Sequence, residues 1–129
     1  MHDVIAYNYR LTNLNAAIGV AQMEYLDKII DNKRKTAKCY EEFFRDKEIK
    51  FFTEPANTIS NYWLNVVQLK DRTEIDKFLE VTNNNGVMTR PVWRLMNKLE
   101  MYKDCQIGNL DNANWLEDRV VNIPSGFRA

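Results

Sequence analysis

The stretch NLNAAIGVAQMEYLDKII, residues 13–30, decides the fold class, because its apolar residues recur with helical spacing. They fall at i, i+3, i+4 and i+7, as in an amphipathic helix. The residues on this face are Leu14, Ala17, Ile18, Ala21, Tyr25, Leu26, Ile29 and Ile30. The period continues downstream, so we predict one long helix over 14–46, bent near 31–32. Asn13 is its predicted N-cap.

The second half of this helix predicts a core face and a solvated face. Tyr40, Phe43 and Phe44 recur with the same period and are expected in the core. Cys39 is expected beside them as a small buried hydrophobe. The basic run 33–35 lies mostly on the other face, among acidic residues, and is interpreted as solvated surface rather than a phosphate site.

Short strands and helices alternate after this helix. YWLNVVQL, 62–69, is rich in β-branched and aromatic residues and predicts a strand with Trp63, Val67 and Leu69 on one face. Asp71 and Glu74 then predict a capping box at the start of a helix that ends at Asn85 and Gly86. A strand is predicted over 87–90, stopped by Pro91, and a turn region over 93–103. The last elements are a helix over 112–119, capped by Asp111 or Asn112 with Ala113 and Leu116 inward, and a strand over 119–124. We therefore predict an α+β fold, with a small, mainly antiparallel sheet packed on one long N-terminal helix.

Composition excludes several classes of function. The chain has 129 residues, with 18 basic and 18 acidic side chains, so no basic field draws it to nucleic acid or to anionic lipid. No apolar run approaches the length that spans a membrane. One histidine and two cysteines supply no plausible zinc ligand set. Cys39 and Cys105 are too few for a disulfide framework and indicate a reducing, cytoplasmic compartment.

The ends of the chain suggest a part of something larger. Residues 1–12 show neither helix nor strand period, whereas domains usually begin in solvated polar segments. We expect residues 1–12 to be a segment left from the junction with a missing large domain, and 13–129 to be a small domain truncated at its end. His2 and Asp3 are interpreted as a frayed terminus rather than an acid–base pair.

Two polar stretches are candidates for chemistry. In TRPVWRLMN, 89–97, Arg90, Trp93 and Asn97 follow a strand end; guanidinium groups suit phosphate or carboxylate, and Trp offers a stacking surface. A turn with a buried Trp is the alternative. In YNYR, 7–10, an asparagine and an arginine precede a helix N-terminus, where N–H groups and the helix dipole favour an anion. Simple capping by Asn13 with packed tyrosines is the alternative there.

A family resemblance bears on both stretches. The pattern Tyr7-Asn8-Tyr9-Arg10, then Asn13, Leu14, Ala16, Ala17, Gly19, Gln22 and Met23, resembles the segment after the large domain in the DegT/DnrJ/StrS family of sugar aminotransferases. The stretches GVMTRPVWRLMNKLEMYKDCQ and NANWLEDRVVNIPSG are similar to the branch that makes 4-amino sugar nucleotides for legionaminic-type nonulosonic acids. The resemblance covers nearly the whole chain, although Ala6 stands where relatives usually have glycine.

The resemblance implies the fold, cofactor and site residues. It implies the small C-terminal domain of a fold-type I aminotransferase, a homodimer that uses pyridoxal 5'-phosphate. Asn8 would reach across the dimer to the cofactor phosphate of the partner subunit. Arg10 would support it or contact substrate, and Arg90, Trp93 and Asn97 would contact the sugar nucleotide. No catalytic residue is expected here, because the lysine that holds the cofactor belongs to the large domain.

The implied reaction moves an amino group from an amino acid, expected to be glutamate, to the C4 keto group of a nucleotide-linked 6-deoxy sugar. The isolated fragment is expected to be inactive and to bind no cofactor. The alternative is a free-standing binding or dimerisation module that reuses this domain without catalysis. A lysine-bearing domain upstream in the reading frame would favour the enzyme, and a true start codon at Met1 would favour the module.

Overall fold

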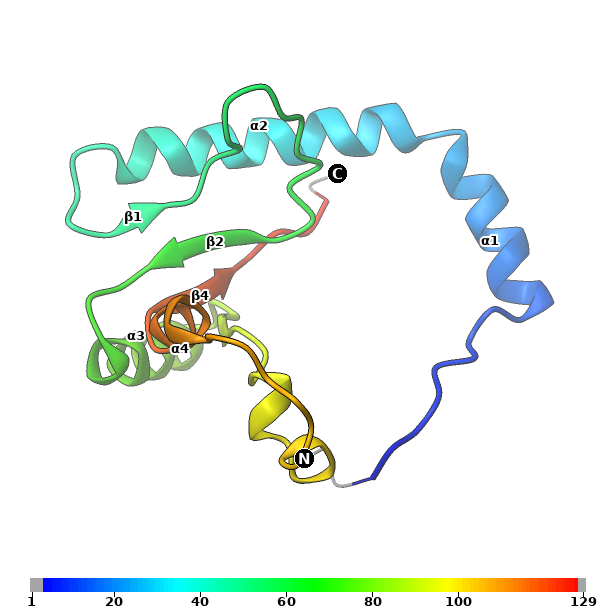
Figure 1. Cartoon of the computed structure of the whole chain (residues 1–129). Coiled ribbons are helices and arrows are strands. Elements are labelled where there is room, and N and C mark those ends of the chain that lie inside the picture. Colours follow the sequence, from blue (N-terminus) through cyan, green and yellow to red (C-terminus); the bar gives the residue numbers. More distant parts are fainter. Residues whose placement is uncertain (1–3, 128–129) are drawn as a thin grey trace.

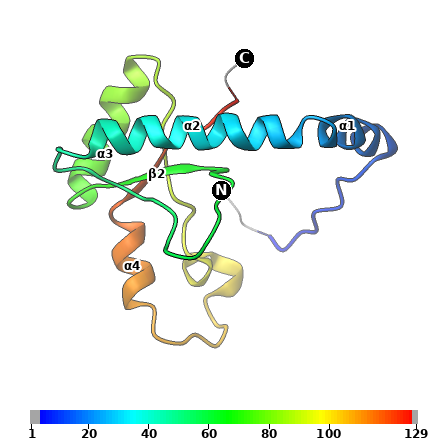
Figure 2. The same cartoon turned by 90° about the horizontal axis from the view of Figure 1, so that it is seen from above.

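The long helical stretch forms two helices, not the single bent helix that the sequence predicts. Helix α1 spans Asn13–Met23 and helix α2 spans Leu26–Phe44. The break falls at Tyr25, and residues 31–32 lie inside α2. Figure 2 shows α1 end-on while α2 runs across the picture, so their axes differ in direction. The prediction is wrong because only α2 has buried side chains, so no packing holds α1 on the same axis.

The N-cap of α1 is Thr12, not the predicted Asn13. Thr12 has extended backbone angles, φ −83° and ψ 163°, and its hydroxyl oxygen accepts a hydrogen bond from the Asn15 N–H at 3.3 Å. Asn13 is already the first helical residue. Threonine and asparagine are both good caps, so the one-residue shift depends on where the extended backbone ends.

This computed structural model describes residues 4–127 and contains one antiparallel sheet. Its strands are β1 (Lys50–Phe51), β2 (Asn65–Gln68), β3 (Arg90–Pro91) and β4 (Val120–Ile123), in the order β1-β2-β4-β3. The predicted fold class is confirmed. The strand predicted over 87–90 is shorter than expected: β3 begins only at Arg90 and ends with Pro91. An edge strand tolerates this proline, because the missing N–H removes no ladder bond on the solvent side. The predicted His2 and Asp3 terminus lies outside the described residues.

One face of the sheet packs against α2 and α3 (Arg72–Asn84), which contribute Ala37 and Ile75 to the core. Figure 1 shows α2 running over β1 and β2. The buried core consists of Ala37, Phe51, Val67, Leu69, Ile75, Val121 and Ile123. Tyr40 and Phe44 pack against it as predicted, but Phe43 is 60% exposed and Cys39 is exposed too. Both predictions are wrong because the buried stripe of α2 passes through Thr36 and Ala37.

Local signals place α3 correctly. The Asp71 carboxylate accepts the Glu74 N–H at 3.0 Å, and the Glu74 carboxylate accepts the Lys70 N–H at 2.6 Å. The helix ends at Asn85, and Gly86 has φ +75°, which glycine adopts at little cost. The predicted Asp71 cap and the C-cap are therefore confirmed, but Glu74 accepts the N–H one residue before the cap rather than that of Asp71 itself.

The other side of the sheet carries α4 (Asp111–Glu117) and two short 3₁₀ turns, η1 (Met96–Lys98) and η2 (Glu100–Tyr102). The turns confirm the helical-turn prediction for 93–103. The predicted cap of α4 is wrong, because Leu110 occupies the N-cap position without a side-chain bond. Glu117, rather than an apolar residue, is the buried side chain of α4.

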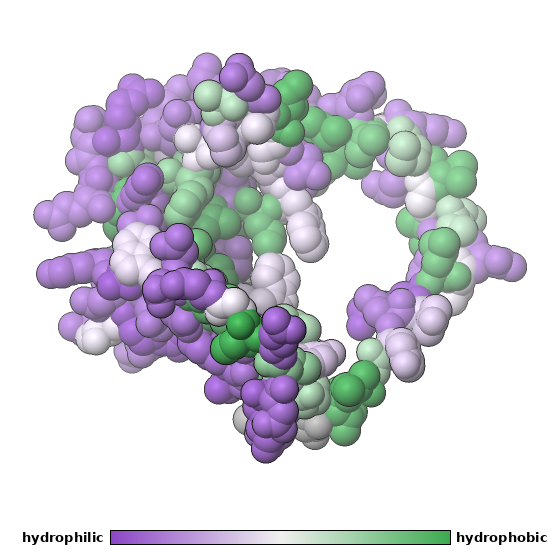
Figure 3. All heavy atoms as spheres, in the orientation of Figure 1, coloured by the Kyte–Doolittle hydropathy of each residue, from purple (hydrophilic) through white to green (hydrophobic). Residues whose placement is uncertain are grey.

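Residues 4–12 and α1 form an arm that stands apart over most of its length from the rest of the chain, which we call the body (residues 26–127). Figure 3 shows an open space between the arm and the body, with apolar residues along the arm. The large exposed apolar residues of the arm are Val4, Ile5, Tyr7, Tyr9, Leu11, Leu14, Ile18, Val20 and Met23. Among residues 4–127, no helix has both the length and the apolar content to cross a membrane.

Candidate functional site

The candidate site lies on the sheet face that α2 and α3 leave open. Successive residues of a strand point to opposite faces, so Val66 and Asn122 face away from the core that Val67 and Val121 enter. Arg90 lies directly opposite Asn122 in the strand register, and its side chain therefore shares this open face. Two hollows lie here, one at the ends of β2 and β4 beside α2 and one on the open face, and each contains one residue predicted from the sequence.

The first hollow is a pocket of about 590 Å³, which we name the Lys33–Arg90 pocket. It is lined by Lys33, Trp63, Leu64, Met88, Arg90, Asn122, Ile123, Pro124, Ser125 and Gly126. The Lys33 ammonium donates to the carbonyl oxygens of Ser125 at 2.6 Å and Trp63 at 3.3 Å. Lysine 33 therefore ties α2 to the ends of β2 and β4, and is not the solvated residue that the basic run predicts.

The second hollow is an apolar groove of about 510 Å³, which we name the Trp93 groove. It is lined by Phe52, Val66, Val92, Trp93, Leu95, Ala113, Leu116, Glu117 and Val120. Ala113 and Leu116 both line the groove, but Leu116 is 38% exposed, so the prediction that it lies inward is wrong, while Ala113 is half-buried as predicted. Because its walls are almost entirely apolar, the groove suits a hydrophobic surface or ring rather than a charged group.

Two exposed tryptophans lie between the hollows. The ring centroids of Trp63 and Trp93 are 6.5 Å apart at an interplanar angle of 31°. Their exposed fractions are 67% and 68%. Strand alternation predicts Trp63 on the core face with Val67, but this is wrong because β2 begins only at Asn65 and Tyr62 has φ +45°. That turn directs Trp63 to the surface, and a positive φ is unusual for a bulky residue.

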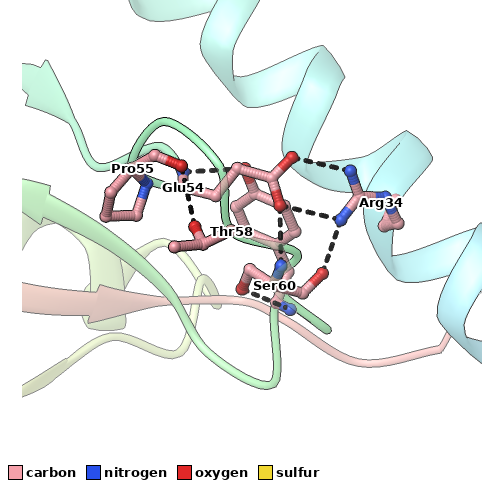
Figure 4. Close-up of polar contacts among 6 residues, drawn as sticks. Arg34, Glu54, Pro55, Thr58 and Ser60 are labelled. Atoms are coloured by element: carbon pink, nitrogen blue, oxygen red, sulfur yellow. Dashed lines mark hydrogen bonds and ion pairs between the residues drawn. The ribbon is translucent and has the colours of Figure 1, made fainter.

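A hydrogen-bonded network holds this turn against α2 (Figure 4). The Arg34 guanidinium donates to both carboxylate oxygens of Glu54, at 2.9 and 2.7 Å, and to the Ser60 carbonyl at 2.6 Å. The Ser60 N–H donates to Glu54 at 2.6 Å. The Glu54 N–H donates to the Tyr62 hydroxyl at 3.1 Å. Arg34 is thus a paired residue, and of the basic run only Lys35 is the exposed residue that the sequence predicts.

The network also changes the pKa values of Glu54 and Arg34. The hydrogen bond from Arg34 lowers the pKa of Glu54 to about 2, and the Ser60 N–H adds to this effect. The same pairing raises the pKa of the Arg34 guanidinium. The pair is therefore fully charged near neutral pH, and it anchors the segment that leads to Trp63.

The loop that carries Trp93 is anchored by Glu117. Its carboxylate accepts the Leu95 N–H at 3.0 Å and forms a short ion pair with Lys98. Burial would raise the pKa of Glu117, but the bonds from Lys98 and Leu95 outweigh burial and lower the pKa below its ordinary value. A buried, charged carboxylate therefore connects α4 to both ends of the turn that follows Trp93.

Asn8 and Arg10 lie on the arm, and both are exposed. The Arg10 carbonyl accepts hydrogen bonds from the Thr12 N–H at 3.1 Å and from the Asn15 side chain at 2.8 Å. These bonds order the backbone where the arm enters α1. The exposed Asn8 amide can donate to a phosphate oxygen, so its chemistry fits the implied cofactor contact.

The structure places Arg90 and Trp93 in two different hollows, and Asn97 in neither. Asn97 is half-buried in η1. The arm meets this loop in a further hollow of about 400 Å³, lined in part by Val4, Ala6 and Trp93. Asn8 lies two residues beyond this contact.

Sequence reasoning missed Lys33, Trp63 and Glu117 as site residues. Lys33 bonds to Ser125, 92 residues away, so no local pattern indicates this role. Glu117 carried a weak signal, since it is an acidic residue on the side of α4 that also carries the inward-facing Ala113.

Comparison with known proteins identifies the relatives of this chain. Residues 1–128 match the model of the DegT/DnrJ/EryC1/StrS aminotransferase family. The chain is 36% identical over 127 residues to a GDP-perosamine synthase of Vibrio cholerae, covering 96% of this chain and 35% of that protein. It is 26% identical over 130 residues to a protein of Bacillus subtilis named as a pyridoxal phosphate-dependent aminotransferase, covering 97% and 34%.

A solved structure shares the fold. The chain superposes with a TM-score of 0.78 on the sugar aminotransferase CalS13 from Micromonospora echinospora, at 21% identity, covering 95% of this chain and 33% of that one. The chain thus spans about a third of the length of the relatives that it matches.

Proposed function

Because this chain belongs to the DegT/DnrJ/EryC1/StrS aminotransferase family, we propose that it is the small C-terminal domain of a pyridoxal-phosphate-dependent sugar-nucleotide aminotransferase. The observation that carries the proposal is the family match over 1–128 together with Arg90 and Trp93 on one open sheet face. Bound pyridoxal phosphate would supply the carrier for the amino group. The residues of this chain would position the phosphate and the sugar nucleotide.

In the proposed site, the arm would contact the cofactor. Asn8 would donate its amide N–H to the cofactor phosphate of the partner subunit in a homodimer, and Arg10 would support it. The exposure of both side chains is consistent with a ligand or partner on that side. The large apolar residues of the arm are exposed, and contact with water is unfavourable for them. The remaining two thirds of the protein and the second subunit would bury them.

The open sheet face takes the sugar side. We place Arg90 and Trp93 against the nucleotide-linked keto-sugar, with Asn97 as a more distant contact. The substrate would be a 6-deoxy sugar aminated at C4, with glutamate as the donor, and the pathway would be that of the legionaminic-type nonulosonic acids. The Vibrio cholerae relative is named for a GDP-linked sugar, which supports a nucleotide sugar as the substrate class. The exposed free thiols Cys39 and Cys105 are consistent with a cytoplasmic protein.

The test is the visible absorption spectrum of the full-length protein, recorded before and after borohydride. We expect a cofactor band that borohydride removes, because borohydride reduces the bond between the cofactor and its lysine. The isolated 129-residue chain should catalyse no amino transfer. A colourless protein at its native boundaries would contradict the proposal and favour a non-catalytic binding or dimerisation module.

A further inference from the structure

The Lys33–Arg90 pocket carries two positive charges that no described residue neutralises. The ion pairs within residues 4–127 are Arg34–Glu54, Lys35–Asp31, Arg72–Asp76, Lys98–Glu117 and Lys103–Glu100. Neither Lys33 nor Arg90 belongs to them, and none of the residues lining the pocket is acidic. Two cations beside apolar walls, without a carboxylate, create a positive potential that attracts an anion.

Both cations keep hydrogen-bond donors for a ligand. An ammonium group has three N–H donors, and Lys33 uses two of them on the carbonyl oxygens of Ser125 and Trp63. The side-chain partner of the Arg90 guanidinium is the weakly accepting Met88 sulfur at 3.3 Å. The planar fork of an arginine matches the oxygens of a phosphate.

The pocket is assembled from four separate segments. Lys33 comes from α2, Trp63 precedes β2, Arg90 begins β3, and Ser125 follows β4. The Ser125 hydroxyl donates to the Ile123 carbonyl at 2.8 Å and accepts the Asn65 N–H at 2.6 Å, which fixes the pocket floor. The site is therefore held by long-range bonds before any ligand arrives, and preorganisation of this kind favours binding.

We propose that the Lys33–Arg90 pocket binds the diphosphate of a nucleotide, with the exposed face of Trp63 stacking on the attached ring. This inference rests on the proposed function for the identity of the nucleotide sugar. The charge and shape of the pocket, by contrast, are properties of its lining residues and do not depend on the proposed function. The new elements are Lys33 as a phosphate ligand and Trp63 as the second aromatic wall.

Charge and size favour a diphosphate over the carboxylate of an amino-acid donor. Two unpaired cations match the two negative charges of a diphosphate bridging two groups, whereas one carboxylate would neutralise only one. A pocket of about 590 Å³ falls within the range of roughly 300 to 1,000 Å³ typical of sites for whole small molecules. A neighbouring hollow of about 500 Å³ is lined by Arg72, Arg94 and Lys98. Its cations are offset, because Arg72 pairs with Asp76, Lys98 pairs with Glu117, and Asp118 also lines the hollow.

The experiment is calorimetric titration of the full-length protein with UDP and with GDP, each without sugar. Arg90→Gln should weaken binding of the preferred nucleotide about tenfold or more, because charge-assisted bonds are lost. Lys33→Gln should have a similar effect, and Trp63→Ala should weaken binding about fivefold or more. Lys35→Gln and Arg45→Gln are matched controls, since both residues are exposed and lie outside the pocket. Melting temperatures verify that each variant folds.

Arg90 is the decisive variant, because it holds no other segment in place as Lys33 does. Unchanged nucleotide affinity in Arg90→Gln would overturn the proposal. So would a variant whose KM rises for the amino donor while its nucleotide affinity stays the same, since the pocket would then bind a carboxylate. The borohydride test does not depend on this titration, so failure of the proposed function and failure of this pocket assignment remain distinguishable.

Discussion

The body and the arm use apolar residues in opposite ways. The body buries Ile75, Val67 and Val121 completely between the sheet and its helices. The arm buries no side chain, although α1 has no charged residue and carries Leu14, with an exposed fraction of 71%. A helix with this many exposed apolar side chains is unusual on a protein surface. The comparison shows that the body buries its apolar residues in a core of its own, whereas the arm leaves its apolar residues exposed.

The largest expected effect is a difference in stability loss between a core substitution in the body and a matching substitution in the arm. Ile75→Ala should destabilise the 129-residue chain by about 2 to 5 kcal/mol, because it leaves a cavity in the core. Ile18→Ala in α1 should change the stability of the same chain by less than about 0.5 kcal/mol, because its side chain is 53% exposed. Urea denaturation measures both. Equal losses would show that α1 is packed on the body.

The same pair of variants can be compared in the full-length protein. There Ile18→Ala should cost more than in the 129-residue chain, because the proposed large domain and second subunit would cover α1. If Ile18→Ala changes the free energy of unfolding by nearly zero in both proteins, α1 is not buried in the full-length protein. The exposed apolar residues of the arm would then not mark a contact surface.

The sequence predicted the parts of the body that depend on local signals. The Asp71 cap and the Gly86 helix end are set by residues a few positions apart, and both are confirmed. The break at Tyr25 could not be read from helical periodicity, because it depends on which half of the stretch meets the sheet. For the same reason, the exposure of Cys39 was missed.

The residues of the candidate site also fall into two groups, those that local sequence signals predict and those that depend on distant partners. Arg90 and Trp93 were predicted because a strand end and a proline mark the loop in the sequence. Lys33 and Glu117 gain their roles from partners in distant segments, which only the folded chain brings together. Trp63 was assigned to the wrong face, because a left-handed turn at Tyr62 interrupts the alternation.

A second prediction tests the two faces of the body. Glu117→Ala should destabilise the chain by about 1 to 3 kcal/mol, because it removes the acceptor of the Leu95 N–H and the partner of Lys98. Under the proposed function, Glu117→Gln in the full-length protein should raise the KM for the sugar nucleotide more than it lowers kcat, because it loosens the turn after Trp93. In the 129-residue chain, Trp93 fluorescence, isolated in a Trp63→Phe and Trp115→Phe background, should shift as well. Glu100→Gln removes an exposed ion pair and is the control. An unchanged KM with a lower melting temperature would limit Glu117 to a structural role.

A third prediction concerns a polar residue within the core. Asn65 is 1% exposed, and its side-chain amide has no hydrogen-bond partner among residues 4–127. Asn65→Leu, which keeps the branched shape and the number of non-hydrogen atoms, should stabilise the chain by about 1 kcal/mol, because an unsatisfied buried polar group is replaced by an apolar one. Thermal unfolding measures the change. Asn122→Leu, on the open face, should give no such gain, and a destabilised Asn65→Leu chain would contradict the prediction.

The smallest effect is the pH dependence of the Glu54 anchor. Its pKa is lowered from 4.5 to about 2 in the folded chain. The anchor therefore contributes stability that is fully present above pH 4.5 and is lost as the pH falls toward about 2. The urea midpoints of the wild type and Glu54→Gln should differ most near neutral pH and converge as the pH falls through this window. Glu42→Gln removes an exposed carboxylate of α2 and should not reproduce the convergence. A difference that stays constant down to pH 2.5 would mean that the charge of Glu54 does not hold the turn before Trp63, and the body would then position this tryptophan through packing alone.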